Sequence, residues 1–118
     1  MSKILVVEDD VDTSRLLTRW LRRDRHEVVI EGSGEGALRR LGEGSYDLLL
    51  LDIHLPGIDG YKVARRARAL QTPPSVLALT IDDREQVPGD MKIPLLEKPY
   101  THAALRSAIN QVLTAEHG

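Results

Sequence analysis

Side chains that can do chemistry follow four of the short apolar runs in this sequence of 118 residues. After residues 4–7, 48–51, 76–79 and 93–96 come, in that order, Glu8-Asp9-Asp10, Asp52, Thr80 and Glu97-Lys98. Such runs predict buried parallel strands, and ligands of open α/β sheets bind beyond the carboxyl ends of the strands. The sequence therefore predicts a site where carboxylates, a hydroxyl group and an ammonium group meet.

Such a site suits phosphoryl chemistry. Crowded carboxylates repel one another, and a divalent cation with oxygen ligands and waters, Mg²⁺ or Mn²⁺, relieves the repulsion. A carboxylate can attack phosphorus to give an acyl phosphate, and this transfer needs mainly positioning and charge neutralisation. On this interpretation Asp52 is the nucleophile, Lys98 pairs with Asp52 or with a phosphate oxygen, and Thr80 donates a hydrogen bond to that oxygen.

Each of these residues also has an ordinary structural interpretation. Asp10 is expected to cap a helix that begins near Val11. Taken alone, Asp52 is more often a loop acid than a nucleophile, Thr80 an ordinary strand residue and Lys98 a surface lysine. Their joint placement at the ends of separate strands favours the chemical interpretation.

The elements that must position these groups alternate along the chain. Apolar runs predict strands, the last one weak, at 4–7, 28–30, 48–51, 76–79 and 93–96. Helical spacing of apolar residues predicts helices over 11–24, 34–41, 58–70 and 101–114, with Thr101 as a cap. This alternation predicts an α/β fold with a parallel sheet and right-handed crossovers. Pro88 and Gly89 disfavour a helix interior, so only a short helical piece is expected over 83–87.

Composition narrows the class of protein. Sixteen basic and eighteen acidic residues give a formal net charge of −2, which predicts no strong general affinity for nucleic acid or an anionic membrane. The arginines of 15–25, 39–40 and 65–68 fit solvated helix faces or, alternatively, a basic patch for an acidic partner. The absence of cysteine excludes disulfides and thiolate chemistry. No segment resembles a signal peptide or a membrane span, so a cytoplasmic location is the default expectation.

The motifs around these residues resemble those of the receiver domain of bacterial two-component response regulators, over essentially all 118 residues. The motifs are ILVVEDD (4–10), LLLLDIHLPGIDG (48–60), LALT (77–80) and LLEKP (95–99). The resemblance implies a flavodoxin-like, doubly wound sheet of five parallel strands in the order 2-1-3-4-5, flanked by helices. In this chain the fourth helix is expected to be short or irregular.

Carried over by position, the resemblance implies a role for each site residue. Asp52 becomes the phosphoacceptor and a metal ligand, Asp9 binds the metal directly, and Glu8 binds it through water or supports it. The backbone carbonyl of His54 is the third protein ligand, whereas the side chain of His54 either lines the site or faces solvent. The implied metal is Mg²⁺ or Mn²⁺.

The resemblance also implies a switch. Thr80 moves toward the phosphoryl group, Lys98 pairs with that group, and a partner-binding face rearranges. The implied donor is a phosphohistidine on a histidine kinase or a histidine phosphotransfer domain, or a small acyl phosphate. Residues 1–118 are expected to form one receiver domain that has an unknown downstream protein partner. It is expected to bind neither nucleic acid nor membrane directly and to catalyse only its own phosphorylation and slow dephosphorylation.

Three features depart from the family pattern. Leu95 stands where an aromatic switch residue is usual, Ile81 stands where a small residue is usual, and the stretch from Thr80 to Lys98 is about one helical turn short. Ile81 either narrows access to Asp52 or turns away. A constitutive, non-phosphorylated interaction module therefore remains an alternative, although the intact acids, threonine and lysine argue against it. An aspartyl phosphatase is disfavoured because a second acid two residues after Asp52 is missing.

Overall fold

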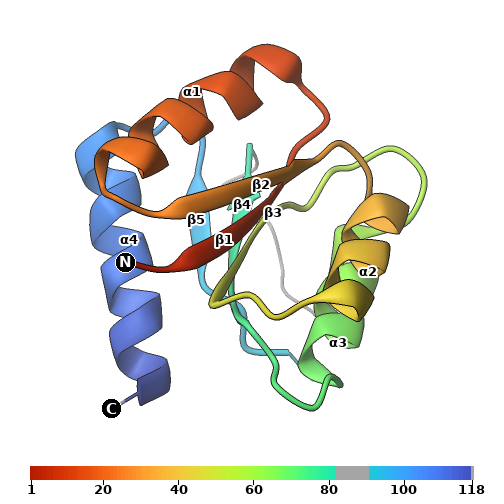
Figure 1. Ribbon diagram of the computed structural model, residues 1–118. Coiled ribbons are helices and arrows are strands. Elements are labelled where there is room, and N and C mark those ends of the chain that lie inside the picture. Colours follow the sequence, from red (N-terminus) through yellow and green to blue (C-terminus); the bar gives the residue numbers. More distant parts are fainter. Residues whose placement is uncertain (82–90, 118) are drawn as a thin grey trace.

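A computed structural model describes residues 1–81 and 91–117, with side chains described up to Ala115. Its five strands form one parallel sheet in the order β2-β1-β3-β4-β5 (Figure 1). The strands are β1 (Lys3–Val7), β2 (Glu27–Glu31), β3 (Leu48–Asp52), β4 (Ser75–Thr80) and β5 (Leu95–Glu97). The predicted fold class and strand order are therefore confirmed.

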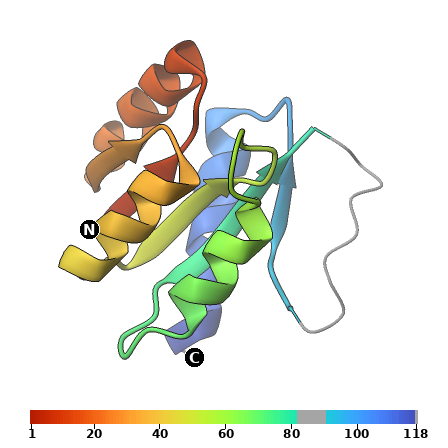
Figure 2. The ribbon, with the colours of Figure 1, turned by 90° about the vertical axis from the view of Figure 1, so that its right-hand side faces the viewer.

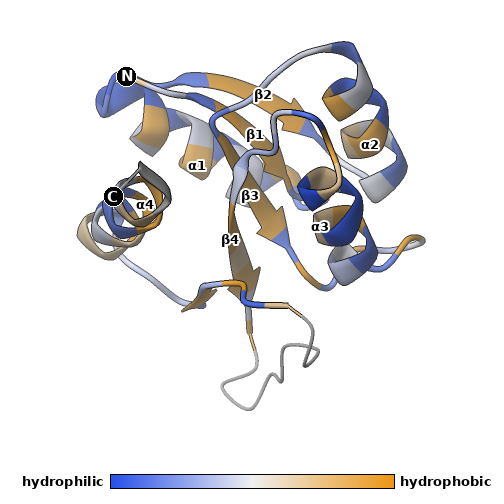
Figure 3. Ribbon diagram, turned by 90° about the horizontal axis from the view of Figure 1, so that it is seen from below, coloured by the Kyte–Doolittle hydropathy of each residue, from blue (hydrophilic) through white to orange (hydrophobic). Residues whose placement is uncertain are grey.

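In the described part of the chain, four helices cover the two faces of the sheet. They are α1 (Val11–Arg23), α2 (Gly34–Glu43), α3 (Gly60–Arg68) and α4 (His102–His117). Helices α1 and α4 lie on one face, and α2 and α3 lie side by side on the other (Figures 1 and 2). Each helix turns its apolar side toward the sheet (Figure 3), which the spacing of its apolar residues requires. Within the described residues, the helices lack the combination of length and apolar composition that a membrane span requires.

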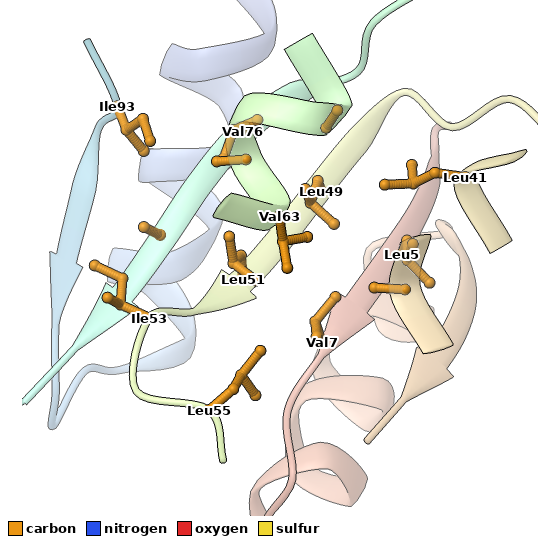
Figure 4. Close-up of a cluster of buried hydrophobic side chains, with 14 of the residues drawn as sticks. Leu5, Val7, Leu41, Leu49, Leu51, Ile53, Leu55, Val63, Val76 and Ile93 are labelled. Atoms are coloured by element: carbon orange, nitrogen blue, oxygen red, sulfur yellow. The ribbon is translucent and has the colours of Figure 1, made fainter. Parts of the chain in front are cut away.

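The alternation of side chains along the strands divides the interior into two cores. Leu49 and Leu51 of β3 point toward α2 and α3, where they pack with Val63 (Figure 4). Leu48 and Leu50 belong to the opposite core, together with apolar residues of α1 and α4. Because both faces are covered, β3 is buried along its whole length. This explains why its sequence is a continuous apolar run and not an alternating one.

Side chains cap the starts of the four described helices, and the sequence predicts two of these caps. The Oδ2 atom of Asp10 accepts a hydrogen bond of 2.9 Å from the N–H of Thr13, which caps α1. The Oγ1 atom of Thr101 accepts one of 3.0 Å from the N–H of Ala104 at the start of α4. Both predicted caps are confirmed, and each satisfies a backbone donor that the helix itself leaves free.

Of the connection from β4 to β5, the structure describes Ile81 and residues 91–94. The helical piece predicted over 83–87 lies outside the described residues. The last strand begins at Leu95, two residues after the predicted start, and Pro94 contributes only its carbonyl, to the N–H of Ala78 at 3.0 Å. Because proline has no N–H to donate, it sits at the margin of the ladder and not within it.

Candidate functional site

The acidic residues that follow β1 and end β3 meet at the carboxyl edge of the sheet. Val7 is paired with Leu51 in the β1–β3 ladder, so Glu8 and Asp52 leave the sheet side by side. One carboxylate oxygen each from Glu8, Asp9 and Asp52 lies within 4.8 Å of the others. Glu8 and Asp52 are buried, with 3% and 7% of their surface exposed, whereas Asp9 is exposed. Two carboxylates of the cluster are thus enclosed by the protein, and the third is accessible to solvent.

Lys98 reaches this cluster from the segment that follows β5. Its Nζ atom lies 3.2 Å from Oε2 of Glu8 and 3.4 Å from Oδ2 of Asp52. Partial burial of the Lys98 ammonium opposes its charge, but the carboxylates of Asp52 and Glu8 outweigh burial and raise the pKa of Lys98 above its usual value. Lys98 therefore stays charged at neutral pH, between two acids.

Glu8 is the acid whose ionisation the fold opposes. Burial, aided by the negative charge of Asp52, raises the pKa of Glu8 above its usual value, although a hydrogen bond from the N–H of Asp10 and the charge of Lys98 act the other way. Three carboxylates face one ammonium, so the site carries two uncompensated negative charges when all groups are ionised. An oxygen donor set with this charge fits a small hard dication such as Mg²⁺.

Thr80 ends β4 beside the lysine. It is buried, and its carbonyl accepts a hydrogen bond of 2.7 Å from the N–H of Lys98. The β3–β4 register places Asp52 opposite Leu79, directly before Thr80. The parallel ladder therefore brings together residues that are far apart in the sequence.

The backbone after β3 orients the Asp52 carboxylate. The N–H of His54 donates a hydrogen bond of 3.0 Å to Oδ1 of Asp52. The side chain of His54 is exposed, which favours the interpretation in which it faces solvent. Further along this segment, Gly57 has a φ of +83°, a left-handed conformation that glycine adopts without strain.

Two residues that depart from the family pattern are exposed. Ile81 is 71% exposed, which favours the interpretation in which its side chain turns away from Asp52. Leu95 is 36% exposed on the edge strand β5. The position at which the family usually has an aromatic switch residue therefore presents an aliphatic side chain near the surface.

Two contributors to the site carried no signal in the sequence. Burial, with the negative charges of Glu8 and Asp52, raises the pKa of Tyr100 to about 12. The hydroxyl group of Tyr100 therefore interacts electrostatically with the acidic cluster. The carboxylate of Glu35, in the first turn of α2, accepts a hydrogen bond of 3.2 Å from the N–H of Ile58 in the segment after β3. Neither residue belongs to a motif at the end of a strand, so only the tertiary contacts reveal them.

Comparison with known sequences gives a consistent assignment. The sequence profile of the family described as response regulator receiver domain matches residues 4–110. The response regulator receiver protein CpdR of Brucella abortus is 32% identical over 118 residues, which cover 95% of this chain and 94% of CpdR. The response regulator ArlR of Staphylococcus saprophyticus is 36% identical over 83 residues, 70% of this chain but 38% of ArlR. The chain thus spans about two fifths of the length of ArlR and of other curated relatives.

Comparison with solved structures shows the same fold. The response regulator protein TrrA from Thermotoga maritima, solved in complex with Mg²⁺ and BeF, is 29% identical to this chain with a TM-score of 0.85. The comparison covers 95% of this chain and 99% of TrrA. The likeness thus extends over nearly the whole of both chains.

Proposed function

Since this chain belongs to the response regulator receiver domain family, we propose that it accepts a phosphoryl group on Asp52 and thereby switches a partner-binding face. Glu8, Asp9, Asp52 and the backbone carbonyl of His54 would hold Mg²⁺, or Mn²⁺ in its place. The observation that carries the proposal is the convergence of three carboxylate oxygens within 4.8 Å, with the Lys98 ammonium 3.4 Å from Asp52. The bound dication supplies positive charge that offsets the carboxylates and the incoming phosphoryl group.

The chain's own groups account for the transfer step. An oxygen of the Asp52 carboxylate forms a bond to phosphorus while the phosphorus–nitrogen bond to the donor imidazole breaks. The electron pair of that bond stays on the imidazole nitrogen, which takes up a proton. The N–H of His54 holds Asp52 in one orientation, and Lys98 moves its charge toward a phosphoryl oxygen. The hydroxyl group of Thr80 donates a hydrogen bond to a phosphoryl oxygen, and this bond couples phosphorylation to the conformational change.

The partners follow from the same chemistry. The donor is a histidine kinase or a histidine phosphotransfer domain, and the output is a change in affinity for a downstream protein. A cavity of about 260 Å³ beside Lys98, lined on the α1 side by Leu16, Leu17 and Trp20, offers a place for an apolar side chain of the donor protein. Residues 1–118 act as one receiver domain in the cytoplasm. Through these residues the protein contacts neither nucleic acid nor membrane and catalyses only its own phosphorylation and slow dephosphorylation.

A mass measurement tests this proposal. The protein is incubated with Mg²⁺ and acetyl phosphate, and the intact mass is expected to rise by one phosphoryl group. Asp52→Asn should abolish the gain, whereas Asp12→Asn, a matched change at an exposed acid in the first turn of α1, should leave it intact. An unmodified wild-type protein under these conditions, and with a phosphorylated histidine donor, would favour the constitutive interaction module instead.

A further inference from the structure

The segment that follows β3 is held at both of its ends. Residues 53–59, called here the β3–α3 loop, connect β3 to α3 and carry His54. At the near end, the N–H of Ile53 donates to the carbonyl of Leu79 at 3.1 Å, and the N–H of His54 donates to Asp52 at 3.0 Å. At the far end, the loop lies against the beginning of α2 (Figures 1 and 2). Its conformation therefore depends on a helix that supplies none of the expected site ligands.

The contact with α2 is close and involves consecutive residues on both sides. The N–H of Ile58 donates a hydrogen bond of 3.2 Å to Oε1 of Glu35. A Cβ atom on Gly34 would lie 2.0 Å from Cγ2 of Ile58, so the isoleucine side chain packs directly on the α carbon of that glycine. A Cβ atom on Gly57 would lie 3.1 Å from Oε1 of Glu35. The first turn of α2 is thus in close contact with Gly57 and Ile58 of the loop.

Through this contact Glu35 can influence the conformation of the loop that leads back to the site. We propose that Glu35 is a positioning residue for metal binding and phosphoryl transfer, an inference that rests on the proposed function of Asp52. Only Leu55, Pro56 and Gly57 separate His54 from the residue that Glu35 holds. With Ile58 anchored, the backbone of His54 has a defined direction, and the Asp52 carboxylate is oriented with it. Without the anchor, the positive-φ glycine gives the loop other conformations to adopt.

The carboxylate suits this role for an electrostatic reason. A hydrogen bond from a backbone N–H to an ionised acceptor is stronger than one between neutral groups. Glu35 also lies in the first turn of α2, where the helix dipole favours a negative charge. Changes to groups that orient metal ligands typically cost about 10- to 100-fold in metal affinity or activity. Because Glu35 acts through the loop, we expect an effect near the lower end of that range.

Three variants separate positioning from other effects. Glu35→Met removes the acceptor but keeps the length of the side chain and a good helix former. Glu35→Gln removes the charge but keeps an oxygen acceptor for the N–H of Ile58. Glu43→Met makes the first change at the other end of α2, about 12 Å away along the helix axis. The Gln variant is the conservative rescue, because it shares the lost helix-dipole interaction with the Met variant but not the lost hydrogen bond.

Titration calorimetry with Mg²⁺ alone gives the dissociation constant for the full chain, and acetyl phosphate at saturating Mg²⁺ gives the phosphorylation rate. We expect Glu35→Met to raise the Mg²⁺ dissociation constant about tenfold and to speed hydrogen exchange at the Ile58 amide. Glu43→Met should stay within about twofold of wild type, and Glu35→Gln should lie between wild type and Glu35→Met, because it keeps the acceptor but loses the charge. A merely structural role would lower the unfolding midpoint of Glu35→Met without changing Mg²⁺ affinity at a temperature where the variant is folded.

The outcomes distinguish this inference from the proposed function. If wild type binds Mg²⁺ and is phosphorylated but Glu35→Met matches it in affinity and rate, the positioning role is wrong and the function of Asp52 stands. If wild type neither binds Mg²⁺ nor gains a phosphoryl group, the proposed function fails first, and the positioning role fails with it. Should Glu35→Met not fold, Glu35→Ala replaces it, and equal Mg²⁺ affinity in the Ala and Gln variants overturns the inference.

Discussion

Lys98 is the only described cation that ion-pairs with both Glu8 and Asp52, and we expect its removal to destabilise the metal-free protein. Its Nζ atom lies 3.2 Å from Glu8 and 3.4 Å from Asp52, and only 22% of the Lys98 side chain is exposed. Lys98→Met keeps the stem that packs at the site but removes the charge. The two buried carboxylates are then left to repel each other without a counter-ion.

The magnitude follows from these distances. At an effective dielectric constant of about 20, each contact contributes roughly 5 kcal/mol of Coulomb attraction. Desolvation of the buried ions opposes this by several kcal/mol, and breaking a buried pair typically costs about 3 to 5 kcal/mol. Because the Lys98 side chain keeps some contact with water, we expect Lys98→Met to lower the free energy of unfolding by about 2 to 3 kcal/mol. That loss is a large part of the total stability of a domain of this size.

Urea unfolding at neutral pH in the presence of a chelator measures this effect. With an m value of about 1.5 kcal/mol/M, the midpoint should fall by between about 1.3 and 2 M. Lys62→Met, at an exposed lysine on α3, should change the free energy of unfolding by less than about 0.5 kcal/mol.

A double-mutant cycle identifies the cause. In a Glu8→Gln background, Lys98→Met should cost about 1 to 2 kcal/mol less than in wild type, because one of the two acids is already neutral. If Lys98→Met is as stable as Lys62→Met, or if its cost is the same with Gln at position 8, the electrostatic account of the site is refuted.

Three further expectations concern Tyr100 beside the site, His26 before β2 and the cap of α4. The pKa of Tyr100, about 12, should be seen as a late tyrosinate step in an ultraviolet titration that Tyr100→Phe removes; that step should move to lower pH in Asp52→Asn. Burial lowers the pKa of His26, whose Nδ1 accepts from the N–H of Ser2 at 3.2 Å. The unfolded chain therefore binds more protons below about pH 6.5, so stability should fall as the pH drops through that range, and less so in His26→Gln. Thr101→Ala should lower the free energy of unfolding by about 1 kcal/mol, measured by urea unfolding, because the cap of α4 is lost.

The sequence determined the sheet and the position of the acidic cluster. A fully apolar run such as Leu48–Leu51 has no polar side for water, so it predicts a strand covered on both faces. The carboxyl ends of parallel strands share one edge, so residues directly after β1 and β3 must lie near each other. The convergence of Glu8, Asp9 and Asp52 therefore follows from local patterns and topology. The cap at Asp10 is equally local, because its partner lies three residues away.

The margins of elements were less predictable. The strand predicted to begin at Ile93 begins at Leu95, and the helix predicted to begin at Ile58 begins at Gly60, after its cap Asp59. In both places the apolar pattern starts before the first residue of the element. Backbone hydrogen bonding, and not hydropathy, decides where the element begins.

The contacts between elements were decided by the tertiary structure alone. The carboxylate of Glu35 and the N–H of Ile58 form a hydrogen bond although they lie 23 residues apart in the sequence. Nε2 of His102 lies 2.9 Å from Oδ2 of Asp24, which is 78 residues away in the sequence. The rings of His102 and Trp20 are stacked, with their centroids 5.2 Å apart. Such pairs depend on how far each helix is rotated and shifted over the sheet, and two helices with the same apolar stripe can differ in both. The sequence thus placed the three carboxylates of the site, whereas the packing of α2 decided that Glu35 holds the β3–α3 loop beside them.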